Sequence, residues 1–458
     1  MHEVELKRRP VGGLSSVLPE RQAARLEAAM RRAAEALVGR TIWNVSSTAN
    51  GGGVAEMLYN LLGYFLDAGI EARWLVIDAD EQFYAITKRV HNAIHGIQEE
   101  FAVADHAHYE QVLARNLPPF LDALRPGDVV MLHDPQTAGL AIPAKQRNAR
   151  VVWRSHIGRD TPNGASEAGW EFVRRYVENA DALIFSRPQY APPWVGPGKL
   201  QTIPPSIDPL SAKNRRIASA ECVRILGEAG LPADGRLVTQ VSRWDRLKDM
   251  PGVMAGFRAA APPADVQLVL AGPAVAGVTD DPEGTKVFTE CQLARAQLPT
   301  GIRERVHLAS IPMDDAERNA TIVNALQRHA TIIVQKSLAE GFGLTVAEGM
   351  WKAKPVIGSA VGGIQDQIIS ERSGLLLSDP ADPAGLSAAL RRLLDDEPLA
   401  ARLGLAAHAR VREHYLDDRQ LTQTAALLQD LIAGSPTGRS RPPAVPEQAG
   451  QAPGRAAS

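Results

Sequence analysis

The sequence predicts an α/β protein made of two doubly wound domains, each built on a parallel sheet. In both halves of the chain, short apolar segments typical of buried strands alternate with segments of helical periodicity. A proline-rich stretch without periodicity, at about 203–212, separates the halves and indicates a hinge. The length of 458 residues also exceeds what one hydrophobic core usually supports.

The composition argues against several classes of protein. The formal net charge of -2 and the pI near 6.6 show no basic excess, which disfavours nucleic acid as the main partner. Cys222 and Cys291 lack partners at metal-ligand spacing, so neither a disulfide framework nor a zinc cluster is expected. No signal peptide and no membrane-spanning run is apparent, which predicts a soluble cytoplasmic protein without a membrane partner.

The first half begins with an amphipathic helix at about 18–38, expected to be a packing element, and a short strand at 41–45. The sequence SSTANGGGVAEMLYNLLGYFLDAG follows, so a glycine loop opens the next helix. The loop does not match the dinucleotide-binding GxGxxG fingerprint. Its chemistry would come from backbone amides of Gly51, Gly52 and Gly53, which could face an anion or a hydroxyl.

Polar side chains follow the next three predicted strands. After the strand at 72–77, a helical segment would put Lys88, His91 and Asn92 on one face, although a solvated helix rim is an equal alternative.

The strand DVVML ends in His133 and Asp134, and the strand ARVVWRSH ends in Arg154 and His156. The carboxyl ends of parallel strands are where α/β proteins place ligands. A purely structural role for each histidine stays open.

The second half repeats the alternation of strands and helices, with strands RLVTQVS, VQLVLAG, RVHLAS and ATIIVQ. Helices are predicted at 383–395, 398–414 and about 417–433, and the last of these could cross back to the first domain. From Gly434 onward the chain has almost no apolar bulk, which predicts a disordered tail.

The stretch from Ile332 to Ile364 is the most informative part of the chain. It predicts a buried strand, a glycine loop carrying Glu340, a helix carrying Glu348, a second strand and a second glycine loop. Unpaired amides at the start of that helix would face an anion, so a phosphate-bearing ligand is the natural expectation. Tight turns are the alternative explanation for the loop glycines Gly341, Gly343, Gly362 and Gly363.

The segment SRWDRLKD places Arg243 and Lys248 on either side of a turn, after the first strand of the second half. A guanidinium fork and an ammonium point charge together suit a diphosphate. A solvated charge cluster would be the simpler explanation if the segment stood alone. Because the stretch 332–364, which carries Glu340 and Glu348, also lies at strand ends of the same predicted sheet, a donor-binding role becomes the better hypothesis.

These motifs resemble a known family. The pairing of SRxxxxK with EGFGLTVAE is similar to that of the family 4 retaining glycosyltransferases, whose GT-B fold has two Rossmann-like domains facing each other across a cleft. The segments GGGVAEMLYNLL, TKRVHNAIHG, HDPQ and WRSHIG resemble the glycosyltransferring trehalose synthases more closely. Ser155 departs from the expected cysteine in WRCH, a change between two small residues.

The resemblance implies a role for each matching residue. The catalytic set would be His156, Glu340, Arg243 and Lys248, and His156 would lie beside the donor sugar. Arg243 and Lys248 would bind the donor diphosphate, Glu348 the ribose, and Glu340 with the amides of Gly341, Phe342, Gly343, Leu344 and Thr345 the donor sugar and phosphate. The loop of Gly51, Gly52 and Gly53 would approach the phosphate and the acceptor. By position, we add Asp134, Lys88, His91 and Asn92 as candidates for the acceptor pocket.

The resemblance also implies domain bounds: a first, acceptor domain at 1–205, a second, donor domain at 206–415, a helix at 416–433 and a tail at 434–458. The expected reaction transfers glucose from a nucleoside-diphosphate glucose to free glucose, with retention, and forms α,α-trehalose reversibly. No cofactor or metal would be required, because arginine and lysine carry the counter-charge, while bound magnesium stays open. The oligomeric state stays open as well, a homodimer included.

Two alternatives differ from this expectation. The same fold could use another acceptor, either phosphate, as a trehalose phosphorylase does, or another small polyol or sugar. The chain could also be a sensor of sugar nucleotides without turnover. The nucleotide base of the donor does not follow from the sequence.

Overall fold

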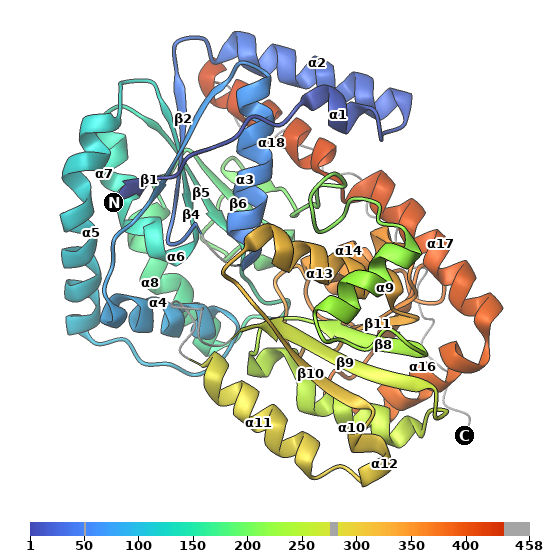
Figure 1. The fold of residues 1–458 in the computed structure, drawn as a ribbon. Coiled ribbons are helices and arrows are strands. Elements are labelled where there is room, and N and C mark those ends of the chain that lie inside the picture. The colour runs from blue at the N-terminus through green and yellow to red at the C-terminus, as the bar shows by residue number, and fades with distance from the viewer. Residues whose placement is uncertain (50–51, 275–282, 435–458) are drawn as a thin grey trace, which may run out of the picture.

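The computed structural model describes residues 1–49, 52–274 and 283–434. Gly51 of the predicted glycine loop and residues 435–458 of the predicted tail lie outside these described residues. Two α/β units stand one above the other in Figure 1, and each contains one sheet. This arrangement confirms the predicted fold class of two doubly wound domains with parallel sheets.

The first sheet has seven strands in the order β1-β3-β2-β4-β5-β6-β7. All neighbours are parallel except the two-residue edge strand β1, which is antiparallel to β3. Its interior strands are apolar on both faces, as expected for a sheet covered by helices on each side. The strands are β1 (His2–Glu3), β2 (Thr41–Ser46), β3 (Glu71–Val76), β4 (Val129–His133), β5 (Arg150–Ser155), β6 (Ala182–Phe185) and β7 (Leu200–Thr202).

Helices cover both faces of the first sheet. One hydrophobic core joins the sheet to α2 (Glu20–Ala36), α3 (Gly52–Asp67) and, from the far end of the chain, α18 (Asp417–Ala433). The other face packs on α4 (Glu81–Ile94), α5 (Val103–Ala123), α7 (Ala141–Gln146) and α8 (Gly164–Val177). Short helical segments complete the unit: α1 (Val11–Ser15), α6 (Asp134–Thr137), η1 (Ala138–Leu140) and η2 (Pro188–Tyr190).

The second sheet has six parallel strands in the order β10-β9-β8-β11-β12-β13. Counted along the chain this is the order 3-2-1-4-5-6 of the dinucleotide-binding fold. The strands are β8 (Arg236–Val241), β9 (Val266–Pro273), β10 (Val306–Ile311), β11 (Ile332–Gln335), β12 (Val356–Ser359) and β13 (Leu375–Leu377).

Helices also cover both faces of the second sheet. Helices α10 (Met250–Ala260), α11 (Gly284–Ala296) and α16 (Pro383–Asp395) share one core with it. Helices α9 (Ser219–Glu228), α13 (Ala316–His329), α14 (Leu344–Trp351) and α17 (Glu397–His414) cover the opposite face. The remaining elements are η3 (Arg246–Lys248), α12 (Thr300–Arg303) and α15 (Ile364–Gln367).

The chain crosses between the two units twice. It leaves the first sheet through the proline-rich segment after β7, and it returns through α18, which lies beside α2 in Figure 1. An isolated bridge between Ile207 and Leu416 joins the two crossing segments. Leu421 and Leu428 of α18 are fully buried in the core of the first unit. The helix therefore fastens the end of the chain to the unit in which it begins.

Within the described ranges, no helix is long and apolar enough to cross a membrane.

Candidate active site

The candidate site lies where the strand order reverses in each sheet. In the first sheet the order reverses between β2 and β4, and in the second between β8 and β11. Open parallel sheets bind ligands outside the carboxyl ends of the strands at this reversal. Each of these four strands is followed by predicted site residues: β2 by the loop of Gly52 and Gly53, β4 by Asp134, β8 by Arg243 and Lys248, and β11 by Glu340. The topology thus brings residues from distant parts of the sequence to two facing sheet edges.

The second domain contributes ion pairs. The Nζ atom of Lys248 lies 2.7 Å from Oε2 of Glu340, and the hydroxyl of Ser337 donates to the same oxygen at 3.1 Å. Nη2 of Arg243 lies 3.2 Å from Oδ2 of the buried Asp245. Two predicted donor-binding cations thus flank one turn, and each contacts a carboxylate.

Another lysine, absent from the sequence prediction, lies directly behind this turn. Lys336 is fully buried, and its ammonium is paired with the carboxylate of Asp249. Asp249 has a left-handed backbone with φ 43°, and its side chain accepts from Gly252 N at the start of α10. This ion pair holds the end of the turn that carries Lys248.

The glycine loop of the second domain lies against the first domain. A Cβ atom on Gly341 would be 2.5 Å from the carbonyl oxygen of His156, so only glycine fits there. Gly343 begins α14 with φ 84°, a left-handed conformation that side chains rarely adopt. The side chain of Phe342 is buried in the domain core, and Oγ1 of Thr345 donates to Oε1 of Gln335. In this loop the backbone, more than these side chains, is placed to meet a ligand.

Two helix N-termini meet at the site. A Cβ atom on Gly53, in the first turn of α3, would be 2.6 Å from Cδ1 of Leu344, the first residue of α14. Helix N-termini carry unpaired amides and the positive end of the helix dipole. Because the two ends converge from different domains, their fields add at one place. Such a place favours an anion with several oxygens.

Glu348 is buried inside α14, with 1% of its surface exposed. Nε2 of Gln327 lies 3.3 Å from one of its oxygens, and Nζ of Lys213 lies 3.6 Å from the other. Lys213 also pairs with Glu56 of α3, so it connects the two domains. Burial lowers the pKa of Lys213, but the carboxylates of Glu348 and Glu56 outweigh burial and raise it overall. The predicted ribose-binding position therefore lies at an interdomain ion pair that the sequence did not indicate.

The first domain contributes a pair of histidines. Nδ1 of His133 lies 3.1 Å from Nε2 of His156, and Nε2 of His133 lies 3.0 Å from Oδ1 of Asn44. The backbone N–H of His156 donates to Oδ1 of Asp134 at 2.8 Å. Burial lowers the pKa of His133 to about 3, and it holds the pKa of His156 well below its usual range. Burial also raises the pKa of the Asp134 carboxyl to about 7.

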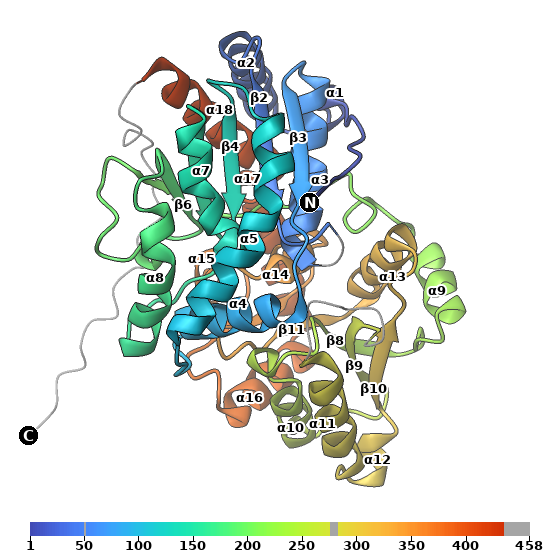
Figure 2. The ribbon, with the colours of Figure 1, turned by 90° about the vertical axis from the view of Figure 1, so that its left-hand side faces the viewer.

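Helix α4 lies at the junction of the two domains in Figures 1 and 2, across from the turn that carries Arg243 and Lys248. Burial is the main cause that holds the pKa of His91 well below its usual range, and charges that include Arg243 and Lys248 add to it. Burial lowers the pKa of His95 to about 4, and Lys248 adds to that effect. The His91 and His95 ring centroids are 4.8 Å apart. His91 of α4 and His95, the residue that follows the helix, therefore both lie within the field of the Lys248 ammonium.

The three predicted α4 residues do not all take part in this face. Burial raises the pKa of Asp245, but Arg243, Lys248 and Lys88 together outweigh burial and lower it, so Lys88 is also near the turn. The side-chain amide of Asn92, in contrast, donates to Glu99 at 3.2 Å. The structure therefore brings Lys88 and His91 to the site, adds His95, and directs the amide of Asn92 to a neighbouring loop. A spacing of four residues after His91 would have indicated His95.

A further set of contacts locks the two domains together beside the site. The Tyr190 hydroxyl lies 2.9 Å from the carbonyl oxygen of Glu340 and 2.8 Å from that of Gly341. The buried Arg187 forms a bidentate pair with Asp366 and also pairs with Asp160. These contacts position the glycine loop of the second domain from the first.

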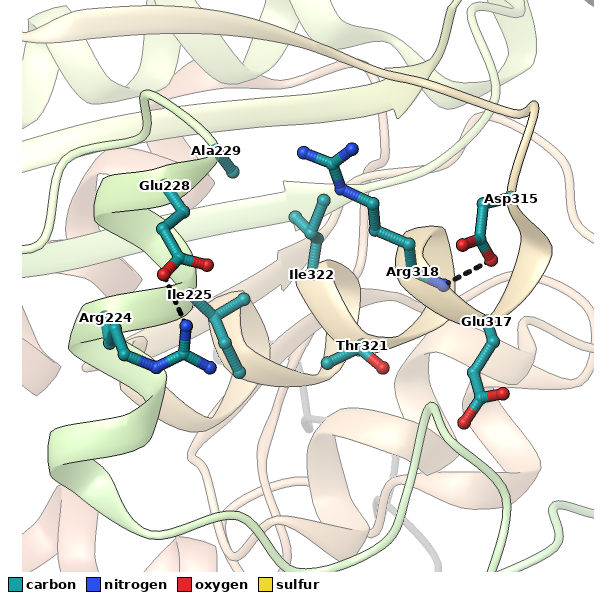
Figure 3. A pocket seen from close by; sticks show the side chains of 9 residues that line it. All are labelled: Arg224, Ile225, Glu228, Ala229, Asp315, Glu317, Arg318, Thr321 and Ile322. Atoms are coloured by element: carbon teal, nitrogen blue, oxygen red, sulfur yellow. Dashed lines mark hydrogen bonds and ion pairs between the residues drawn. The ribbon is translucent and has the colours of Figure 1, made fainter.

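The surface hollow in Figure 3 lies elsewhere, between α9 and α13 of the second domain. It measures about 430 Å³, and two of its charged side chains, Arg224 and Glu228, form an ion pair with each other. None of the predicted site residues lines it. Among the described residues, no group of three or more histidine, cysteine, aspartate or glutamate side chains is placed to hold a metal ion.

Comparison with solved structures first identifies the fold. Two facing parallel-sheet domains of this kind are also found in solved structures of glycosyltransferases with the GT-B fold. One is the sucrose-phosphate synthase of Thermosynechococcus elongatus, with a TM-score of 0.65, 21% identity, and coverage of 86% of this chain and 100% of that one. Another is an α,α-trehalose-phosphate synthase (UDP-forming) from Burkholderia vietnamiensis, with a TM-score of 0.66, 17% identity, and coverage of 86% and 98%.

Sequence comparisons then give the family. Residues 44–192 match the family described as trehalose synthase, N-terminal domain, and residues 227–410 match the glycosyl transferases group 1. The trehalose synthase of Pyrococcus horikoshii is 35% identical over 425 residues, which cover 93% of this chain and 97% of that protein. The trehalose synthase of Thermococcus litoralis is 34% identical and covers 87% and 93%. The chain belongs to the trehalose synthase family of glycosyltransferases.

Proposed function

We propose that the protein transfers glucose from a nucleoside-diphosphate glucose to free glucose and forms α,α-trehalose. The observation that carries the proposal is the convergence of Lys248, Glu340 and two helix N-termini opposite the histidines of the first domain. The cation and the helix ends suit a diphosphate, and uncharged imidazoles suit sugar hydroxyls. The trehalose synthase relatives support trehalose as the product.

The proposed transfer breaks the bond between C1 of the donor glucose and the phosphate oxygen. A bond forms between C1 and the anomeric hydroxyl oxygen of the acceptor, on the face that the phosphate leaves. Because the new bond forms on that same face, the anomeric configuration is retained. The acceptor proton moves to the leaving phosphate oxygen. Preorganised cations and amides at the developing phosphate charge can lower such a barrier by about 3 kcal/mol each.

Same-face attack fits the carboxylates near the site better than a covalent intermediate does. Retaining glycosidases use an ionised carboxylate as nucleophile. Here burial raises the pKa of Asp134 to about 7 and its Oδ1 accepts from His156 N, so the carboxyl is a poor nucleophile. Glu340 is paired with Lys248. In this proposal no cofactor is required, because Lys248 and Arg243 meet the charge of the diphosphate.

A donor panel tests the proposal. ADP-, UDP- and GDP-glucose would each be incubated with and without free glucose, and nucleoside diphosphate release would be measured. The expected result is release that glucose stimulates, with a non-reducing disaccharide whose two anomeric centres are both α by NMR. Release at the rate of hydrolysis alone would contradict glucose as acceptor. Tight donor binding without any release would instead favour the sensor.

A trehalose phosphorylase is the second candidate. The trehalose phosphorylase of Grifola frondosa is 28% identical over 77% of this chain, although the chain covers only 52% of that longer protein. Incubation of trehalose with inorganic phosphate, without nucleotide, separates the two reactions. Glucose phosphate would form under the second candidate, whereas the proposed enzyme needs a nucleoside diphosphate to cleave trehalose.

A further inference from the structure

A hydrogen-bonded chain of three side chains lies at the carboxyl ends of β2, β4 and β5. It runs from Asn44 through His133 to His156. Oδ1 of Asn44 lies 3.0 Å from Nε2 of His133, and Nδ1 of His133 lies 3.1 Å from Nε2 of His156. Asn44 and His133 each expose only 2% of their surface, and His156 is half-buried. The sequence indicated His156 as a site residue and noted His133 at a strand end where ligands bind, but it did not single out Asn44.

The direction of the hydrogen bonds in this chain follows from Asn44. Its carbonyl oxygen faces Nε2 of His133, and an amide oxygen can only accept, so Nε2 of His133 carries the proton. A neutral imidazole with a proton on Nε2 has an unprotonated Nδ1 that accepts. The partner of that Nδ1 is Nε2 of His156, which must therefore donate. This leaves Nδ1 of His156 as an acceptor.

The surroundings of His133 and His156 keep both imidazole rings uncharged. Burial lowers the pKa of both histidines, and the neighbouring Arg154 guanidinium lowers both further. The rings lie nearly parallel, with an interplanar angle of 18° and centroids 5.4 Å apart. The backbone of His156 is fixed separately, because its N–H donates to Asp134. Both the ring and the backbone of His156 are thus held by fixed partners.

We propose that Asn44 and His133 are positioning residues that fix His156 as the Nε2–H tautomer, so that its Nδ1 accepts a hydrogen bond from a donor-sugar hydroxyl. The inference rests on the proposed function, because it places the donor sugar at His156. In this arrangement His156 orients the sugar and does not protonate the leaving group. The tautomer is a property of the free protein and can be measured without any substrate.

Variants of His133 test the positioning role. His133→Phe keeps a ring but removes the acceptor, and we expect kcat to fall about 10-fold or more, with donor KM changed less. His133→Gln restores an acceptor and should recover activity to within about 3-fold of the wild type. His408→Phe is a matched control, since His408 hydrogen-bonds to the Trp351 carbonyl oxygen in the second domain. Equal kcat for the Phe and Gln variants of His133 would overturn the proposal.

Nitrogen-15 NMR of histidine-labelled protein gives the decisive measurement. In the full-length, substrate-free protein, His156 should show a protonated Nε2 and an unprotonated Nδ1, and Asn44→Leu should mix the two tautomers. A wild-type His156 that is cationic or protonated on Nδ1 overturns the inference and leaves the glucose transfer untouched. If the tautomer is as stated but glucose does not stimulate donor turnover, the proposed function fails instead, and with it the role given to Nδ1.

Discussion

The two sides of the site differ in how they treat charge. The second domain provides a charged side, in which Lys248, Arg243 and Lys336 each contact a carboxylate. The first domain provides a histidine side, in which burial lowers the pKa of His91, His95, His133 and His156. A diphosphate needs fixed countercharge, whereas sugar hydroxyls need uncharged donors and acceptors. We infer that the second domain handles the leaving group of the proposed reaction and the first domain handles the sugars.

The largest expected effect comes from removing a cation on the charged side. We expect Lys248→Ala to lower kcat about 100-fold or more, because the leaving diphosphate loses its countercharge and Glu340 loses its partner. The matched control is Lys145→Ala, since Lys145 forms a similar ion pair with Asp181 at 2.9 Å, away from the site. Steady-state kinetics should show the control within about 2-fold of the wild type. If Lys248→Ala and Lys145→Ala lowered kcat equally, the loss would not reflect a special role of the charged side.

The second prediction concerns the ion pair that joins the two sides. Lys213→Met should lower the free energy of unfolding by about 2 kcal/mol, because Glu348 and Glu56 lose the cation that they share. Arg246→Met removes an exposed ion pair with Glu290 and should cost less than about 1 kcal/mol. Urea unfolding followed by circular dichroism measures both. A loss no larger than that of the control would mean that Lys213 does not connect the domains energetically.

The third prediction addresses the meeting of the helix N-termini. Gly53→Ala should lower kcat/KM about 10-fold, because the new methyl group pushes Leu344 and the start of α14 out of place. Leu344→Ala in the same chain should restore part of the loss by making room. Gly227→Ala serves as the control, since nothing lies within 4 Å of a Cβ at that helical position. If the double variant is no better than Gly53→Ala, the close approach of α3 and α14 is not the cause.

The fourth prediction is a pH dependence of stability that arises from the histidine side. The pKa of His95 is about 4 in the fold and near 6.5 in the unfolded chain, so the unfolded state binds the extra proton. The stability that this difference contributes is present above pH 6.5 and is lost as pH falls toward 4. His95→Gln should reduce the slope of unfolding free energy against pH by about 1 kcal/mol per pH unit in that window.

Other groups act on the same pH curve, so the comparison must be between variants. The raised pKa of Asp134, about 7, works in the opposite direction, with stability lost as pH rises from about 4 to 7. This contribution is common to the wild type and His95→Gln, and it cancels in the difference. His2→Gln is the control, because 61% of that side chain is exposed. An unchanged slope in His95→Gln would mean that His95 is charged in the fold.

The fold was largely readable from the sequence. Strands such as DVVML and ATIIVQ are short, apolar and bounded by turn residues, and the three last helices were predicted within about a residue of their observed bounds. The short edge strands β1, β7 and β13 were missed, because two or three residues carry no periodicity. Helix α5 was missed as well, although it has 21 residues; Pro118 and Pro119 lie inside it.

The residues that could meet a phosphate were visible before folding is considered, since Arg243, Lys248, Glu340 and the glycine loop form local motifs. Their contacts, in contrast, follow from how the folded chain packs. Lys213 reaches Glu348 across 135 positions of sequence, and His133 reaches Asn44 across 89. Such pairs depend on strand order and domain packing, which leave no local pattern. Burial likewise set the neutral state of the histidines, because a pKa responds to the surrounding atoms and not to neighbours in the chain.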